Sequence, residues 1–596
     1  MTRIVALLLL SLFCGWRPVL AVGTLRPEQL KPGMKGYGLS VFQGTKPQRF
    51  EVEIVGVLKN TFPKQDMILI RMSGADLEKH KVIAGMSGSP IYIDDKLVGA
   101  LAYGWSFEND PMAGVTPIHN MLAELKQPVI DRTAPAGAGV SHSSAPRSTF
   151  FDLPNATLAR ASDNFSAPRP LLTPLSLAGF SPRVLAQFAP KFERLGMLPV
   201  AAGGAGKSPL PLRSGDIEPG GAIGVQLIRG DMNATAVGTA TYVEKYRILA
   251  FGHPFFQGGA VQAPAVSAEV HTILSSLQTS FKMATPIAEI GSMIGDWQSC
   301  IVADAKVQAR MIPVNVDVAN RSTGQSDHYA LEVMDNQAFT PRLVVLAIAE
   351  AVTAGSSSSQ DTTTRIAVDA ELVPPPESGL APPKTGPPSR TISIANTYFN
   401  PAGGLLDMEA LMPLVAAFDT PFGSPTVKRI EVKVDATLTR QTAEIKRAYF
   451  NKAQVERGEV ALLSIVLKPF GQPEVTRTIP VKVPAATETL RVLAVTVMAG
   501  GNAPPDVAPP DSLDDFLDAI QKGHRNTDLV ALVQTPTQGM QYRGKLLKKL
   551  PPSVVGILED SSTSDASAAA DILQLVEPTD WVLTGQATVR VPIRQE

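Results

Sequence analysis

Gly85-Met86-Ser87-Gly88-Ser89-Pro90 is the most informative hexapeptide of this sequence. Glycines stand two residues before and one residue after a serine, and the small Ser89 and then Pro90 follow them. Because glycine has no Cβ, the backbone can turn tightly here, and the N–H groups of Gly85 and Ser87 can converge on one point. Two converging N–H groups stabilise an oxyanion that forms on a carbonyl carbon. The stretch therefore predicts Ser87 as a nucleophile and Gly85 and Ser87 as its oxyanion hole, with an ordinary glycine/serine turn as the alternative.

A second informative stretch ends at Gly252-His253-Pro254. Residues 221–228 and 234–243 are predicted to form two strands around a turn, and residues 246–251 a third strand that leads into His253. An imidazole at a strand end can act as the general base for a serine hydroxyl. His253 is therefore the predicted base, although a histidine before a proline can also be a simple turn residue.

These residues together resemble a known family. Gly-Met-Ser-Gly-Ser-Pro-Ile at 85–91, the apolar hairpin that follows it and Gly252-His253-Pro254 resemble the SpoIVB-type serine peptidases, in particular the large bacterial proteins that carry this peptidase domain. The resemblance extends over roughly residues 30–370 and implies a trypsin-like double β-barrel. In the sporulation peptidases the histidine precedes the serine and a PDZ domain lies upstream. Here His253 follows Ser87 without a clear PDZ pattern, so we expect half-barrels in permuted order, which can preserve the site geometry.

The resemblance also implies an acidic third residue that orients the imidazole. Asp296 follows His253 at about the spacing found in trypsin-like chains, and Asp304 and Asp76 are the alternatives. A structural turn aspartate, or a Ser–His dyad without an acid, remains open for this position. His80 is close to Ser87 in sequence but is expected at the surface.

A hairpin after the serine is predicted to contain the substrate-binding residues. Apolar runs at 91–93 and 97–102 flank Asp94-Asp95-Lys96, which is typical of a hairpin. In a trypsin-like barrel the second of these strands lines the specificity pocket and pairs with the substrate backbone as an added strand. The predicted substrate-binding residues are therefore Ala102, Tyr103, Gly104 and Trp105.

Composition narrows the class of protein. The chain has 596 residues, 18% of them charged, and a net charge of −1, so a nucleic-acid partner is not expected. Residues 1–21 read as a secretory signal, with Arg3 before an apolar run and Val19-Leu20-Ala21 as the cleavage site. After its removal only Cys300 remains, and no spacing typical of a metal site or cofactor motif is present. We expect an exported protein of the bacterial periplasm or envelope without stable membrane insertion, whose oligomeric state stays open.

The chain is predicted to be mainly β and divided into several parts. In order these are the signal peptide at 1–21, the Ser-bearing half of the peptidase domain at 22–132, a linker and helix at 133–210, the His-bearing half at 211–373, a Pro-rich linker and helix at 374–425, an immunoglobulin-like β-sandwich at 426–500 and a small α+β region at 501–596.

Together these patterns predict a serine endopeptidase that cleaves proteins of the cell envelope through an acyl-enzyme. The alternative is a scaffold that has the peptidase fold and binds peptides without cutting them. No catalytic constellation follows about residue 370, so the C-terminal parts are expected to bind or to act as spacers.

Overall fold

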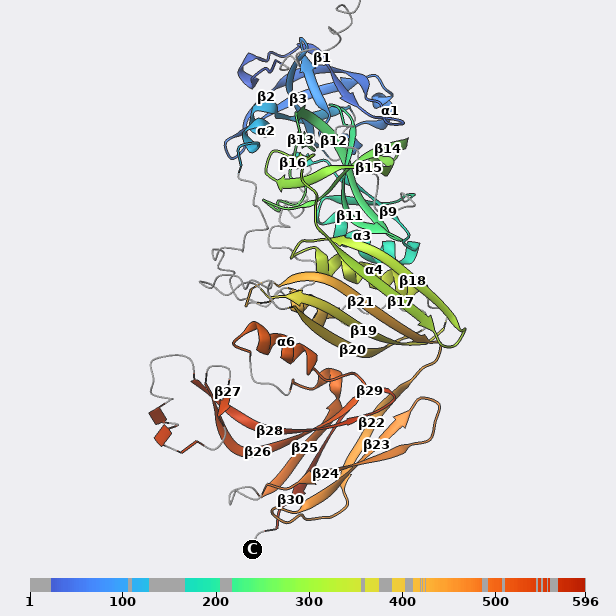
Figure 1. Cartoon of the computed structure of the whole chain (residues 1–596), viewed down its shortest axis with the longest axis vertical. Helices are drawn as coiled ribbons and strands as arrows, with labels where there is room; N and C mark the ends of the chain where they lie inside the picture. The colour runs from blue at the N-terminus through green and yellow to red at the C-terminus, as the bar shows by residue number, and fades with distance from the viewer. Residues whose placement is uncertain are drawn as a thin grey trace, which may run out of the picture.

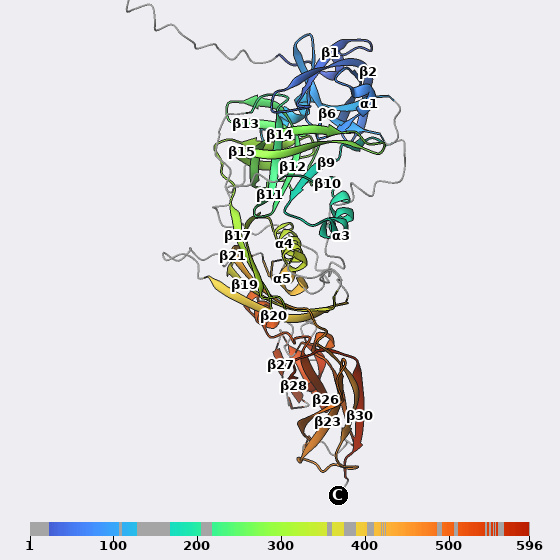
Figure 2. The same ribbon diagram turned by 90° about the vertical axis from the view of Figure 1, so that its right-hand side faces the viewer.

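The computed structural model describes residues 23–594, apart from the gaps 106–109, 128–166, 204–216, 355–359, 375–388, 402–410, 419, 421, 424, 485–490, 506–509, 543–544, 548–549, 552, 555 and 558–565. The predicted signal segment, and much of the linker regions predicted within 133–210 and 374–425, lie outside the described residues. The prediction of a mainly β protein is confirmed. The described parts form an elongated molecule, with the N-terminal strands at one end and the C-terminal sandwich at the other (Figures 1 and 2). No helix in the described ranges is long and apolar enough to cross a membrane.

The first β-barrel contains the serine motif. Six of the described strands close into a ring through the pairing of β5 with both β1 and β6. In ring order they are β1 (Lys35–Ser40), β2 (Gln48–Phe62), β3 (Gln65–Ser73), β7 (Met112–Pro117), β6 (Lys96–Gly104) and β5 (Pro90–Ile93). Alternating residues such as Phe50, Val52 and Ile54 point inward and fill the barrel. The short helices α1 (Leu77–His80) and α2 (Ile118–Glu124) lie where the sequence predicts a helix or turn.

The second β-barrel contains His253 just after one of its strands. Six described strands again form a ring, because β12 pairs with both β11 and β13. They are β11 (Ala222–Gly230), β12 (Asn233–Glu244), β13 (Arg247–Ala250), β16 (Ile301–Asp304), β15 (Ser280–Asp296) and β14 (Ala263–Leu274). Outside the ring, β9 (Thr173–Ala178) extends the sheet from β12, and β10 (Met197–Ala201) pairs with β9. The connecting helix α3 (Pro182–Glu193) begins at Ser181, whose hydroxyl accepts a bond from the N–H of Val184.

A curved sheet continues from the second barrel toward the C-terminus (Figure 2). Its strands are β18 (Gln325–Met334), β17 (Met311–Asn320), β21 (Thr426–Thr437), β19 (Thr362–Val373) and β20 (Arg390–Asn400). Helix α4 (Thr340–Ala354) packs on this sheet and buries nearly all of its side chains. A second helix, α5 (Met412–Phe418), packs against α4.

The C-terminal part is a sandwich of two sheets around one apolar core. One sheet holds β22 (Thr442–Phe450), β23 (Val460–Pro469), β24 (Val475–Lys482) and β29 (Val582–Thr584). The other holds β25 (Val492–Ala499), β26 (Asp528–Tyr542), β27 (Lys545–Leu547), β28 (Ala566–Pro578) and β30 (Gln586–Pro592). The strand pairing thus differs from a sandwich confined to 426–500. Strand β21 joins the preceding sheet, and the inward faces of β22–β25 are covered by strands from the last hundred residues.

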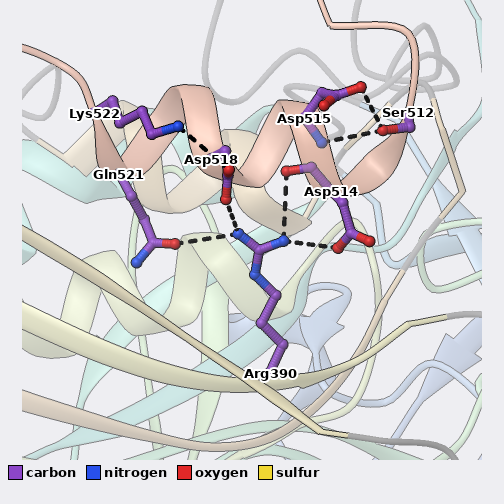
Figure 3. Close-up of polar contacts among 7 residues, drawn as sticks. All are labelled: Arg390, Ser512, Asp514, Asp515, Asp518, Gln521 and Lys522. Carbon is purple, nitrogen blue, oxygen red and sulfur yellow. Dashed lines mark hydrogen bonds and ion pairs between the residues drawn. The ribbon is translucent and has the colours of Figure 1, made fainter.

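Helix α6 (Leu513–Gln521) connects the sandwich to the preceding sheet (Figure 3). Ser512 caps this helix, because its hydroxyl accepts a bond from the N–H of Asp515 at 3.1 Å. Arg390, at the start of β20, pairs with the carboxylates of Asp514 and Asp518 on this helix. Leu517 packs into the core of the second barrel and the curved sheet, so packing against that core stabilises α6.

Candidate active site

The Ser87 turn has the strained backbone that its glycines predict. Gly85 and Gly88 have φ values of +95° and +97°, a region that residues with a Cβ rarely adopt. The N–H of Gly88 donates to the carbonyl of Leu101 at 2.7 Å, and that of Ser89 donates to the carbonyl of Met86 at 2.9 Å. Within the described residues, none of the turn's hydrogen bonds uses the N–H of Ser87. That group, assigned to the oxyanion hole, is therefore left for another acceptor.

Strand β12 of the second barrel holds this turn from the other side. The N–H of Thr239 donates to the carbonyl of Ser87 at 2.8 Å, and the Thr239 hydroxyl donates to the carbonyl of Gly85 at 2.9 Å. The Thr241 hydroxyl donates to the carbonyl of Gly88 at 2.7 Å. All of these groups are buried, so the bonds are shielded from competition with water. The two barrels are joined at the nucleophile turn.

The same strand also positions the residues before His253. Phe251 follows β13, and its N–H donates to the carbonyl of Thr239 at 3.2 Å. The carbonyl of Gly252 accepts a bond from the Thr116 hydroxyl of the first barrel at 2.6 Å. Thr239 thus binds both the Ser87 turn and the segment that leads to His253. Two stretches that are far apart in the sequence meet at this one residue.

The His253 ring carries its proton on Nδ1 and leaves Nε2 unprotonated. Nδ1 lies 2.8 Å from the carbonyl oxygen of Pro254, which can only accept, so Nδ1 is the donor and Nε2 has the free lone pair. Nε2 and the Ser87 hydroxyl are both buried, and neither has a hydrogen-bond partner among the described residues. Burial lowers the pKa of His253 to about 4, so the ring is neutral at pH 7. A neutral imidazole with a free Nε2 is the form that a general base requires.

Asp296 contacts the loop after His253. Its carboxylate accepts bonds from the N–H groups of Phe255 at 2.7 Å, Phe256 at 2.8 Å and Gly258 at 3.0 Å. Burial raises the pKa of Asp296 to about 6, against the opposing effect of these N–H donors. The structure therefore places the Pro254 carbonyl, and not Asp296, at Nδ1 of His253.

The other two predicted acids lie elsewhere. Asp304 forms an ion pair with Arg247 at 3.1 Å, and Asp76 is exposed at the start of α1. Of the remaining histidines, His80 bonds to the Ser275 hydroxyl at 2.8 Å near the surface.

The predicted substrate-binding residues lie on β6 and just beyond it. Ala102, Tyr103 and Gly104 are buried and Trp105 is half-buried, and the Tyr103 ring packs on Phe62 with a centroid distance of 5.0 Å. The backbone of this strand is paired with β8 (Arg169–Pro170), with Tyr103 opposite Pro170 and Gly104 opposite Arg169.

Lys282 is a site residue that the sequence reasoning missed. Its side chain is fully buried, and its Nζ lies 2.9 Å from the Ser40 hydroxyl and 3.3 Å from the Thr239 hydroxyl. A Cβ on Gly85 would lie 3.2 Å from Cδ of Lys282, so the lysine stem lies against the nucleophile turn. Burial lowers the pKa of Lys282 to about 7. Its position in the sequence could have indicated this burial. Alternate residues of a strand share a face, and Lys282 lies on the same face of β15 as Ser280 and Ala284, which are also buried.

Gly88→Ala is expected to lower the free energy of unfolding by about 3–5 kcal/mol. A Cβ at Gly88 would lie 1.9 Å from the carbonyl oxygen of Thr239 and 2.6 Å from the nitrogen of Phe251, both of them backbone atoms. The control is Gly33→Ala, at φ +85° with no atom within 4 Å, which is expected to cost only about 1 kcal/mol. Thermal unfolding of the two variants makes the comparison. Equal losses would show that the Ser87 turn is not packed against β12.

In the described ranges, no group of three or more His, Cys, Asp and Glu side chains is placed to hold a metal ion. Neither the curated proteins nor the solved structures include a match to this chain. Residues 25–122, which contain the Ser87 turn and all six strands of the first barrel, match the family model described as SpoIVB peptidase S55. For this N-terminal region, the match supports the resemblance to the SpoIVB-type serine peptidases.

Proposed function

We propose that this protein is a serine endopeptidase in which Ser87 and His253 form the catalytic pair. The family match supports a serine peptidase at the level of the family. The observation that carries the assignment is Thr239, which binds the carbonyl of Ser87 and the N–H of Phe251 and so brings the two stretches together. We propose further that the two barrels are a trypsin-like pair in permuted order, and that the C-terminal sandwich is an immunoglobulin-like binding or spacing module.

The proposed reaction uses the Ser87 hydroxyl and Nε2 of His253, which have no hydrogen-bond partner among the described residues. The Ser87 hydroxyl attacks a peptide carbonyl carbon while Nε2 of His253 takes its proton. The resulting oxyanion is bound by the N–H groups of Gly85 and Ser87. Nε2 then returns the proton to the leaving amine, the C–N bond breaks and an ester on Ser87 remains. Water hydrolyses this ester with the same base, which restores the serine.

In this mechanism Asp296 acts on the loop that holds His253. Its three backbone bonds fix residues 255–258, and the Pro254 carbonyl fixes the tautomer of the ring. We therefore propose a Ser–His dyad supported by Asp296 in place of a triad with a direct Asp–His bond.

A peptide-binding scaffold without catalysis is the second candidate function, and one observation favours it. Ser87 is 0% exposed and His253 is 2% exposed, so neither side chain can be reached by a substrate in this conformation. We further propose that the protein is exported to the bacterial periplasm or envelope and acts on proteins there. This proposal rests on the signal-like pattern of residues 1–21.

The test is labelling with a fluorophosphonate, which forms a covalent bond only with an activated serine. We expect labelling of the full-length protein, mapped by mass spectrometry to Ser87 and lost in Ser87→Ala. Ser89→Ala is the matched control, because Ser89 lies in the same turn and its hydroxyl is also buried without a partner. Absence of any label on Ser87, in folded protein and after long incubation, would favour the scaffold.

A further inference from the structure

The substrate edge of β6 is occupied by a segment of the chain itself. Arg169 and Pro170 run antiparallel to Gly104 and Tyr103, and the N–H of Leu171 donates to the carbonyl of Ala102 at 2.9 Å. This is the pairing by which an extended peptide adds to an exposed strand edge. The edge is the one that follows the Ser87 hairpin, where a peptide substrate of the proposed enzyme would bind.

Residues 171–174 lie close to the Ser87 turn at both ends of this segment. At one end Leu171 binds Ala102, the neighbour of Leu101, whose carbonyl holds the N–H of Gly88. At the other end Pro174 lies against Gly85, with its Cγ 3.3 Å from the position of a Cβ there. Three residues of extended chain span at most about 11 Å. The peptide bond after Leu171 therefore lies in the short interval between the contact with Ala102 and the contact with Gly85.

The Leu171 side chain fills an apolar site next to this turn. One of its methyl carbons lies 3.1 Å from the position of a Cβ on Gly104, so a side chain there would require Leu171 to shift by a few tenths of an ångström. Leu171 is half-buried and packs against the core cluster that includes Val82 and Met86. An apolar side chain is favoured at this position, and a charged one would lose its hydration without gaining a partner.

We propose that residues 169–172 are an internal strand that occupies the substrate groove, and that the substrates of this site are extended peptides with leucine or a similar apolar residue in the place of Leu171. The inference rests on the proposed function, because it identifies the substrate class of the same site. A substrate or probe must displace the internal strand before Ser87 can react, so the wild type is expected to react slowly.

The experiment compares fluorophosphonate labelling rates of Ser87 in full-length variants. Leu171→Asp places a charge in the apolar site and is expected to release the strand, which should raise the labelling rate at least tenfold. Leu171→Met keeps the apolar contact and is the matched control, with a rate close to that of the wild type. In the Leu171→Asp variant, the anilide of Pro-Arg-Pro-Leu should be hydrolysed and that of Pro-Arg-Pro-Asp should not.

Hydrogen exchange of the Leu171 amide is measured on the same samples. It distinguishes a failure of the internal-strand proposal from a failure of the peptidase proposal. If Ser87 is labelled equally fast in wild type and Leu171→Asp, and the Leu171 amide exchanges freely in both, the internal strand is overturned and the peptidase stands. If Leu171 is protected in wild type and released in Leu171→Asp, yet Ser87 is never labelled, the strand stands and the peptidase fails. Equal hydrolysis of both anilides would overturn the proposed substrate class.

Discussion

His253→Ala is expected to slow fluorophosphonate labelling of Ser87 by about 10²- to 10⁴-fold. In the wild type, Nε2 of His253 is the buried acceptor without a partner, and the proton on Nδ1 is held by the Pro254 carbonyl. Removing the ring removes the base and leaves the Ser87 turn in place, because that turn is held by Leu101, Thr239 and Thr241. The measurement is the second-order rate constant of labelling.

The pH dependence of the same rate tests the identity of the base. Burial lowers the pKa of His253 to about 4, so the neutral ring persists far below pH 6.5. The labelling rate is expected to stay nearly constant as the pH is lowered, until the pH approaches 4. There the His253 ring takes up a proton and cannot act as a base. His271→Ala, which removes an exposed ring bonded to Thr285, is the control and should leave the rate unchanged. A rate in His253→Ala equal to that of the wild type would exclude His253 from catalysis.

The nucleophile turn could be predicted from the sequence because its chemistry is local. Two glycines at fixed positions around Ser87 permit the positive φ values, and the apolar runs after the turn predict β5 and β6. The segment before His253 was predictable for the same reason, since local runs of apolar and β-branched residues form β11, β12 and β13. These parts of the fold need no knowledge of distant contacts.

The occupant of the groove could not be predicted, because nothing local distinguishes it. Arg169-Pro170-Leu171 has no period, and its pairing with β6 depends on backbone groups alone. A proline also argues against a strand, except at a sheet edge, which is where Pro170 lies.

The face of β15 that points inward was equally hard to predict. Phe281 and Met283 suggest one inward face, whereas Ser280, Lys282 and Ala284 are the residues that the structure buries. A shift of one residue exchanges the two faces of a strand, so the sequence alone hides the buried lysine. The role of Asp296 was hidden similarly, because its partners are backbone N–H groups, which every residue but proline carries.

Lys282→Met is expected to stabilise the protein at neutral pH, at a position beside the proposed active site. Burial lowers the pKa of Lys282 to about 7 from an ordinary value of 10.5, so the unfolded chain binds this proton more tightly than the folded one. Stability is therefore highest above pH 10.5, falls as the pH drops toward 7 and is lowest below it. At 1.36 kcal/mol per pKa unit, the full cost of burying this lysine is about 5 kcal/mol. The loss of the bonds to Ser40 and Thr239 offsets about 1–3 kcal/mol of the gain on substitution.

Calorimetry of wild type and Lys282→Met from pH 6 to pH 10 measures this difference directly. The variant should unfold at the higher temperature at pH 6–7, and the gap should close as the pH rises toward 10. Other titrating groups such as His253 and Asp296 are present in both proteins, so the difference curve isolates Lys282. Lys433→Met, which removes an exposed lysine from β21, should give a flat difference curve. A flat curve for Lys282→Met as well would mean that its amine is solvated.

A stabilising substitution at a fully buried position indicates that the native residue was retained for a reason other than stability. The contact of this lysine with Gly85 and Thr239 places that reason at the Ser87 turn.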